Sequence, residues 1–283
     1  RIIADMNLLE LGGERTWLEM DARLIPTVQS ALDKYLFAEQ VKLANRMESL
    51  HEMAIHGPIA AEVLRKTIDA GEVPNDQGCC AVRMLGQEVI AWQDVPCGVP
   101  GYFLVVPSES AAAIWDHLIA TCGNPGVSGA AINVGKRMLR PIGWAAFNTT
   151  RIEAGRPLFG IDFDENFLPA ETAQLGRAVS FTKGCYPGQE IVARMHARQQ
   201  IARQIVGIRI DGDALPIAGT HLYDEHDNQV GGITSSTVSP ILSNAMICLG
   251  VLKRPFFNVD TVVRVPAEGA MRTAKIVQLP FAR

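Results

Sequence analysis

In the first 125 residues, segments with a two-residue hydrophobic period alternate with segments with the helical period of about 3.6 residues. Runs of alternate or continuous apolar residues predict strands, and apolar residues spaced by three and four predict amphipathic helices. Helix starts are marked by Pro26 and by Ser108 as an N-cap, and Gly123 marks a helix end. The predicted elements are a hairpin within 5–20 that turns at Gly12-Gly13, a helix over 26–37, a helix from 57 to about 69, a hairpin over 83–92, a strand over 102–106 and a helix over 109–121. Hairpins that alternate with helices favour an α+β fold.

The pattern changes near residue 200, where only short strands and turns follow. Asp211-Gly212, Asp227-Asn228 and Glu268-Gly269 separate them as turn residues. The predicted strands are 203–210, 220–224, 229–235, 246–253, 261–265 and 271–278. Short strands at regular spacing predict a small barrel or sandwich as a separate C-terminal domain.

Composition narrows the class of protein. The 283 residues carry a formal net charge of −4 and no Lys/Arg run, so direct DNA binding is not expected. No stretch of 18 apolar residues predicts a membrane span. The six cysteines form no C-x-x-C pair, and the histidines have no ligand spacing, so we expect no metal site. Reduced thiols favour a cytoplasmic or mitochondrial matrix location.

The segment Lys183-Gly184-Cys185-Tyr186-Pro187-Gly188-Gln189-Glu190 is the strongest candidate for chemistry. A helix is predicted from about Pro187, with Arg194 on its polar face. Cys185 then lies just before a helix N-terminus and two residues from Lys183, and both features favour a thiolate. The alternative is a buried structural cysteine in a Gly/Pro turn.

A second candidate is Glu153, which the pattern places in the last turn of a helix that ends at Gly155. A carboxylate is disfavoured there by the helix dipole, so its presence suggests a function. It could accept two parallel N–H bonds from a flat 2-amino-4-oxo ring such as a pterin. The alternative is a surface ion pair with Arg151 or Arg156.

Three segments together resemble a known family. They read R-I-E-A-G-R-P-L-F-G-I-D-F-D-E-N-F-L-P-A-E-T, K-G-C-Y-P-G-Q-E-I-V-A-R and V-G-G-I-T-S-S-T-V-S-P. In this order they resemble the YgfZ-type folate-binding proteins, which are related to the glycine-cleavage aminomethyltransferase. The resemblance implies a three-domain ring with a small C-terminal β-barrel. Its domains would be 1–48 with 141–199, then 49–140, then 200–283, and further residues would precede Arg1.

The resemblance also implies tetrahydrofolate, or a one-carbon derivative of it, as the cofactor. We expect Glu153 at the pterin and Arg203 at the glutamate tail. The folate site would also include Tyr186, Gln189 and Arg194. Cys185, Lys183 and Asp5 are the expected catalytic residues.

Three functions stay open on these residues. The first is a folate-dependent accessory protein, partnered by iron–sulfur client or assembly proteins, and Cys185 favours it. The second is a folate-dependent aminomethyltransferase or demethylase. Aminomethyltransferases carry two adjacent aspartates where this chain has Ala4-Asp5, which counts against that function. The third is a scaffold that has lost its ligand.

Overall fold

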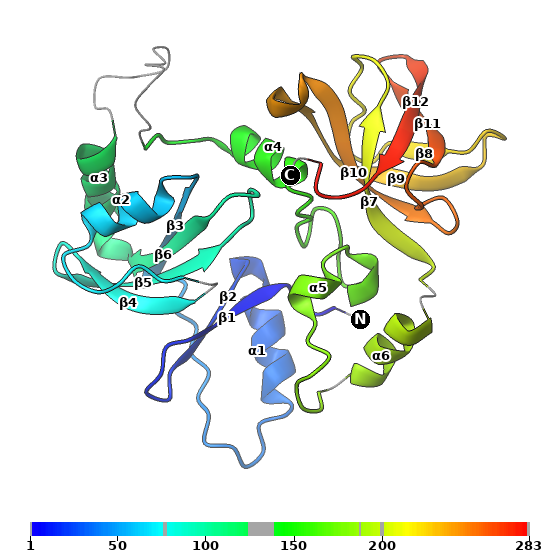
Figure 1. Cartoon of the computed structure of the whole chain (residues 1–283). Helices are drawn as coiled ribbons and strands as arrows, with labels where there is room; N and C mark the ends of the chain where they lie inside the picture. Colours follow the sequence, from blue (N-terminus) through cyan, green and yellow to red (C-terminus); the bar gives the residue numbers. More distant parts are fainter. Residues whose placement is uncertain (1, 76–77, 124–138, 187, 199–200, 282–283) are drawn as a thin grey trace. The chain divides into compact units, whose positions relative to one another are not determined.

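The computed structural model describes residues 2–75, 78–123, 139–186, 188–198 and 201–281 (Figure 1). Its contacts divide the chain into two compact units. One, called the sheet unit below, runs from Met6 to Gly143. The other comprises the first five residues and everything from Trp144 onward, and is called the barrel unit.

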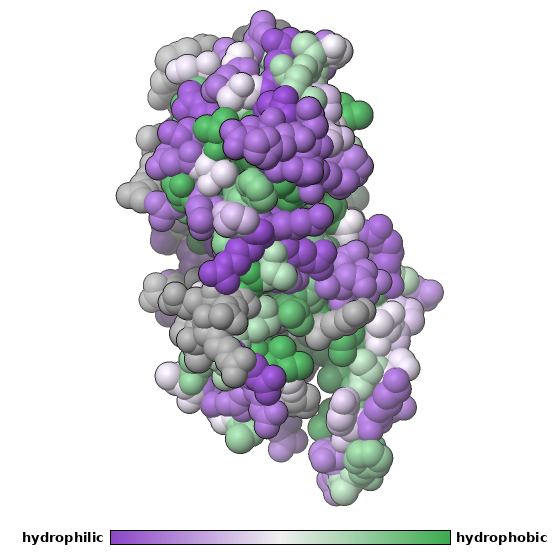
Figure 2. Space-filling model, turned by 90° about the vertical axis from the view of Figure 1, so that its right-hand side faces the viewer, coloured by the Kyte–Doolittle hydropathy of each residue, from purple (hydrophilic) through white to green (hydrophobic). Residues whose placement is uncertain are grey.

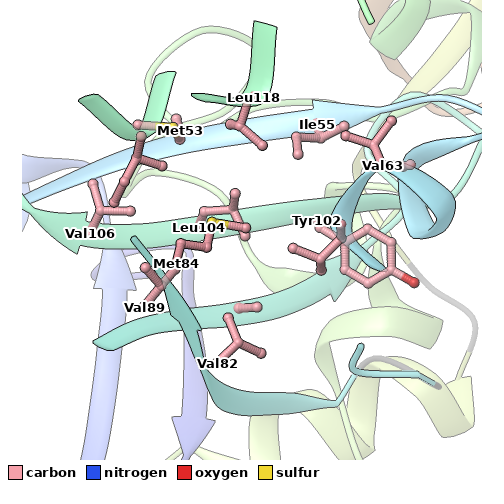
Figure 3. Close-up of a cluster of buried hydrophobic side chains, with 14 residues drawn as sticks. Met53, Ile55, Val63, Val82, Met84, Val89, Tyr102, Leu104, Val106 and Leu118 are labelled. Atoms are coloured by element: carbon pink, nitrogen blue, oxygen red, sulfur yellow. The ribbon is translucent and has the colours of Figure 1, made fainter. Parts of the chain in front are cut away.

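The sheet unit is built on a four-stranded antiparallel sheet. Its order is β3 (Leu50–His56), β6 (Gly101–Pro107), β5 (Gln87–Asp94) and β4 (Cys79–Met84). Two helices, α2 (Ala60–Thr67) and α3 (Ala111–Cys122), pack on one face. The buried side chains between them include Met53, Leu104 and Leu118 (Figure 3).

The other face of this sheet packs against a hairpin. Its strands are β1 (Met6–Glu10) and β2 (Thr16–Met20), which precede α1 (Ile25–Asp33). Leu9 of the hairpin lies in one buried cluster with Ile90, Trp92 and Val105 of the sheet. The strand β5 is therefore buried on both faces, which explains its nearly continuous apolar run.

The barrel unit ends in a closed six-stranded barrel of order β10-β7-β12-β11-β8-β9. The strands are β7 (Arg203–Ile210), β8 (His221–Tyr223), β9 (Gln229–Ser239), β10 (Ala245–Lys253), β11 (Val262–Ala267) and β12 (Ala270–Val277). Branched side chains fill its interior, and closure leaves no open edge. The predicted C-terminal β-barrel is confirmed.

Helices α4 (Trp144–Glu153), α5 (Leu175–Ala178) and α6 (Gln189–Arg198) precede the barrel. Ile152 of α4 packs with Phe163 and Phe167 against Ile205 and Leu249 of the barrel. The face of the barrel that Figure 2 shows, in the upper part of the picture, is mainly hydrophilic. No helix in the described ranges is long and apolar enough to cross a membrane.

Among the predicted boundaries that were wrong, four concern the helices α1, α2 and α3 and the strand β9. The helix α1 ends at Asp33 and not near 37, because Tyr35 and Phe37 are exposed and no packing extends it. Residues 108–110 form a 3₁₀ turn, so Ser110, and not Ser108, precedes α3.

The other two errors concern α2 and β9. The helix α2 stops at Thr67 because the next residue is extended. The strand β9 continues to Ser239, four residues beyond the predicted end at 235.

Candidate functional site

Glu153 lies at the C-terminal end of α4, as predicted, and Gly155 follows with a left-handed backbone, φ +64°. The Glu153 side chain is buried, with 6% of the residue exposed. Its Oε1 accepts a hydrogen bond of 2.5 Å from Oγ of Ser239 on β9. The alternative interpretation as a surface ion pair is therefore wrong.

Arg151, two residues before Glu153 on α4, is also buried, and it pairs with Asp162. Arg151 Nη1 lies 2.6 Å from Asp162 Oδ2, and both side chains are at most 1% exposed. The other carboxylate oxygen of Asp162 accepts from the hydroxyls of Thr234, at 2.6 Å, and Ser235, at 2.7 Å. Burial of a charge pair is tolerated only when its remaining polar atoms are hydrogen-bonded, as they are here.

The strand β9 presents a row of hydroxyls to α4. Ser235 Oγ accepts from Arg151 Nη2 at 2.7 Å, and Thr237 Oγ1 lies 2.6 Å from the hydroxyl of Thr149. Ser239 completes the row with its bond to Glu153. Residues 235, 237 and 239 are all buried on one face of the strand, as the two-residue period requires.

Arg203 begins β7 and already has partners. Its Nε donates to Glu171 Oε2 at 3.2 Å, and its Nη2 donates to the carbonyl of Asn166 at 2.8 Å. The guanidinium also lies 4.0 Å from the ring centre of Phe167. These contacts fix the guanidinium beside the aromatic cluster that α4 joins through Ile152. Contact with a glutamate tail stays a prediction.

The segment around Cys185 is open to solvent. Lys183 and Cys185 are exposed, and the Lys183 ammonium lies 5.2 Å from the ring centre of the half-buried Tyr186. Gln189 begins α6, and Arg194 is exposed on it. Pro187, the predicted first residue of the helix, lies outside the described residues. The interpretation of Cys185 as buried is wrong.

Cys185 differs from the other cysteines in its surroundings. The six cysteines all lie in the described ranges and form no disulfide, and Cys185 alone among them is exposed. Cys248, in contrast, lies inside the barrel, where burial raises the pKa of its thiol to about 12. Cys185 is thus the cysteine most accessible to a reagent. Cys248 is buried, and its raised pKa also disfavours the reactive thiolate.

The predicted residues fall into two groups in the barrel unit. Glu153 follows Ile152 of the buried aromatic cluster, and Arg203 contacts Phe167 of the same cluster. The Cys185 segment leads into α6, which contacts Pro169–Glu171, and Glu171 in turn binds Arg203. Asp5 is half-buried in the same unit, and the backbone N–H of Ile2, three residues earlier, donates to the carbonyl of Phe167. In the described ranges no three His, Cys, Asp or Glu side chains form a potential metal site.

The sequence interpretation missed Arg151, Asp162 and the hydroxyls of β9. A signal was present, because serine and threonine recur at 235, 237 and 239 in a segment otherwise rich in strand-forming residues. Hydroxyls at every second position predict a polar strand face that needs partners.

The fold is mixed α/β and includes a closed six-stranded barrel. The barrel packs against α4, the helix that carries the buried Glu153. Residues 1–183 match the GCVT N-terminal domain, and residues 203–282 match the glycine cleavage T-protein C-terminal barrel domain. The chain therefore belongs to the glycine cleavage T-protein family.

Relatives and a solved structure agree with this assignment. A protein named aminomethyltransferase from Chlorobium chlorochromatii is 31% identical over 256 residues, which are 90% of this chain and 65% of the relative. A mitochondrial aminomethyltransferase from Dictyostelium discoideum is 30% identical, over 83% of this chain and 57% of its own length. The chain thus spans about two thirds or less of these two relatives.

The similarity in structure extends over nearly the whole chain. The crystal structure of the glycine cleavage system aminomethyltransferase T from Bartonella henselae matches with a TM-score of 0.81. It covers 99% of this chain and 72% of the Bartonella chain, at 22% sequence identity. At this identity the match establishes the fold.

Proposed function

We propose that the chain binds tetrahydrofolate, or a one-carbon derivative of it, and that Glu153 receives the pterin ring. The observation that carries the proposal is the buried carboxylate of Glu153 at the end of α4. A carboxylate has about four lone-pair positions, and the hydroxyl of Ser239 occupies one of them. The remaining positions can accept the parallel N–H donors of a 2-amino-4-oxo pyrimidine ring.

For the reaction, we propose folate-dependent transfer of an aminomethyl group. The names of the relatives support this class, and the buried, hydrogen-bonded carboxylate of Glu153 suits a cofactor that must be oriented before transfer. Asp5 and Lys183 are proposed to act at the transfer step. Arg203, Tyr186, Gln189 and Arg194 are proposed as further folate contacts.

A second candidate function is the YgfZ-type role, support of iron–sulfur enzyme assembly or repair. The exposure of Cys185 favours it, because an accessible thiol beside Lys183 suits contact with a partner protein. Iron–sulfur client or assembly proteins are its proposed partners. A cytoplasmic or matrix location is part of both proposals.

Calorimetry with tetrahydrofolate tests the shared part of the proposal. The wild-type chain should bind, and Glu153→Gln should weaken binding by about 1.5–3 kcal/mol if the charged hydrogen bond is present. Glu225→Gln is the matched control, because Glu225 is a highly exposed carboxylate on the barrel. Absence of binding at near-millimolar ligand would refute the proposal.

Two assays separate the candidate functions. Turnover of an aminomethyl-lipoyl carrier protein with tetrahydrofolate supports the transferase. A Cys185→Ser variant that binds folate but fails to sustain an iron–sulfur enzyme in cells supports the accessory role. Iodoacetamide labelling across pH should modify Cys185 first, with Cys97 and Cys248 as internal references. Equal labelling rates would remove Cys185 from either mechanism.

A further inference from the structure

The hydroxyls of β9 do not all have the same task. Ser235 is committed to the Arg151–Asp162 pair, and its loss would remove one hydrogen bond from each of these two buried charges. Thr237 binds neutral groups, the hydroxyl of Thr149 at 2.6 Å and the carbonyl oxygen of Val238 at 3.4 Å. Ser239 is the member of the row whose partner is the carboxylate proposed to bind the ligand.

Ser239 is fixed more firmly than an ordinary surface serine. It is completely buried, it pairs with Ala245 of β10 at the end of the β9–β10 ladder, and Pro240 follows it. Its backbone is therefore fixed, and its Oγ is directed at Glu153. The short distance of 2.5 Å to Glu153 Oε1 is typical of a hydroxyl that donates to an ionised carboxylate.

Glu153 is constrained on its backbone side as well. The Arg151–Asp162 pair fixes the last turn of α4 against the barrel, and Asp162 Oδ2 also accepts from the backbone N–H of Leu158 at 2.9 Å. The remaining freedom lies in the terminal torsion of the glutamate side chain, which has broad minima. A hydrogen bond to one oxygen removes that freedom and sets the plane of the carboxylate.

We propose that Ser239 is a positioning residue, which holds the Glu153 carboxylate in the plane required by the pyrimidine edge of the pterin. This inference rests on the proposed folate binding. Ser239 donates to one oxygen and leaves the remaining lone pairs for the ligand, so it acts on affinity and ring orientation through Glu153 and not by contact with the folate.

The experiment compares three variants by calorimetry with tetrahydrofolate under reducing conditions. Ser239→Ala should weaken binding by about fivefold to tenfold, since the released Glu153 carboxylate must then be ordered when the ligand binds. Thr237→Val is the matched control, because it removes a hydroxyl from the same face of the same strand. It should change affinity by less than about threefold. Ser239→Cys, which keeps the size but donates weakly, should fall between wild type and Ser239→Ala.

The decisive step repeats Ser239→Ala in a Glu153→Gln background. If Ser239 acts through Glu153, the second substitution should weaken binding by less than about twofold beyond Glu153→Gln alone. A purely structural role would weaken binding equally in both backgrounds. Equal affinities of Ser239→Ala and Thr237→Val in the wild-type background would also overturn the proposal.

A measurement without ligand separates failure of this inference from failure of folate binding. In protein labelled with ¹³C at the glutamate carboxyl groups, the signal lost in Glu153→Gln identifies Glu153. That signal should move in Ser239→Ala and stay in place in Thr237→Val. If the wild type binds no folate, the proposed function fails, whereas an unmoved Glu153 signal in Ser239→Ala refutes the positioning role itself.

Discussion

The two units are stabilised in opposite ways. In the sheet unit, α2 and α3 cover the sheet, where Ile114 of α3 lies in one cluster with Met53 and Leu104 of the strands, and the contact is almost wholly apolar. In the barrel unit, α4 meets β9 through buried hydroxyls and the Arg151–Asp162 pair. Apolar packing is non-directional, whereas a network of charged hydrogen bonds is satisfied in only one geometry. The hydrogen-bond network therefore sets the orientation of the helix that carries Glu153, whereas the apolar core of the sheet unit contributes mainly to its stability.

The largest expected effect comes from removal of one buried charge. Asp162→Ala leaves Arg151 charged and unpaired in the interior, so we expect a loss of about 3–5 kcal/mol in the free energy of unfolding of the barrel unit. Urea unfolding measures it. Lys66→Ala is the control, because the Glu62–Lys66 pair is exposed and its loss should leave the midpoint unchanged. If Asp162→Ala lowers the free energy of unfolding as little as Lys66→Ala does, the buried hydrogen bonds of Asp162 do not hold α4 against the barrel as inferred.

A slightly smaller effect is expected from a cavity in the sheet unit. Leu104 is fully buried on β6, and Leu104→Ala should cost about 2–5 kcal/mol through lost burial and an unfilled cavity. Leu104→Met, which nearly keeps the volume, should cost less than about 1.5 kcal/mol. Chemical unfolding of both variants measures these costs. It sharpens the comparison of the two units, because a side chain of similar volume can replace Leu104 but is not expected to replace the charge of Asp162. If Leu104→Met costs as much as Leu104→Ala, the apolar core is less tolerant than we infer.

The smallest effect concerns pH and the hairpin face of the sheet unit. Desolvation, together with the nearby Glu19 carboxylate, raises the pKa of Glu52 from 4.5 to about 8. The folded protein then holds a proton that the unfolded chain releases, so stability should decline as pH rises from about 4.5 to about 8. Glu52 keeps access to solvent, which limits the size of the decline.

Melting temperatures between pH 5 and 9 test this linkage. Glu52→Gln should flatten the decline and raise the melting temperature most above pH 8, because the amide carries no charge to be desolvated. Glu225→Gln is the exposed control and should leave the curve unchanged. If the wild type and Glu52→Gln respond identically to pH, the carboxyl of Glu52 is ionised like a surface glutamate.

The sequence predicted the barrel well because its turns are marked locally. Asp227 and Glu268 adopt left-handed backbones at the turns where they were expected, and each separates two apolar strands. The end of α4 was predicted for the same reason, since Gly155 is a local stop signal.

The partners within the site could not be predicted in this way. Ser239 is 86 positions from Glu153, and helical spacing on α4 gave no reason to bury Arg151. The end of β9 was placed too early because Ser236 to Ser239 offer little apolar periodicity. Burial there depends on hydrogen bonds to α4, and only the tertiary structure supplies them.

One contact of α4 has a consequence for biosynthesis. The backbone N–H of Phe281 donates to the carbonyl of Glu153 at 3.0 Å, and Leu279 packs against Gly155. The helix is therefore completed by residues that leave the ribosome about 130 positions later. During translation the nascent chain can form α4 and most of the barrel, but the end of the helix stays unfinished until residue 281 has emerged. If Glu153 binds folate as proposed, capture of the cofactor is expected only after synthesis has passed this point.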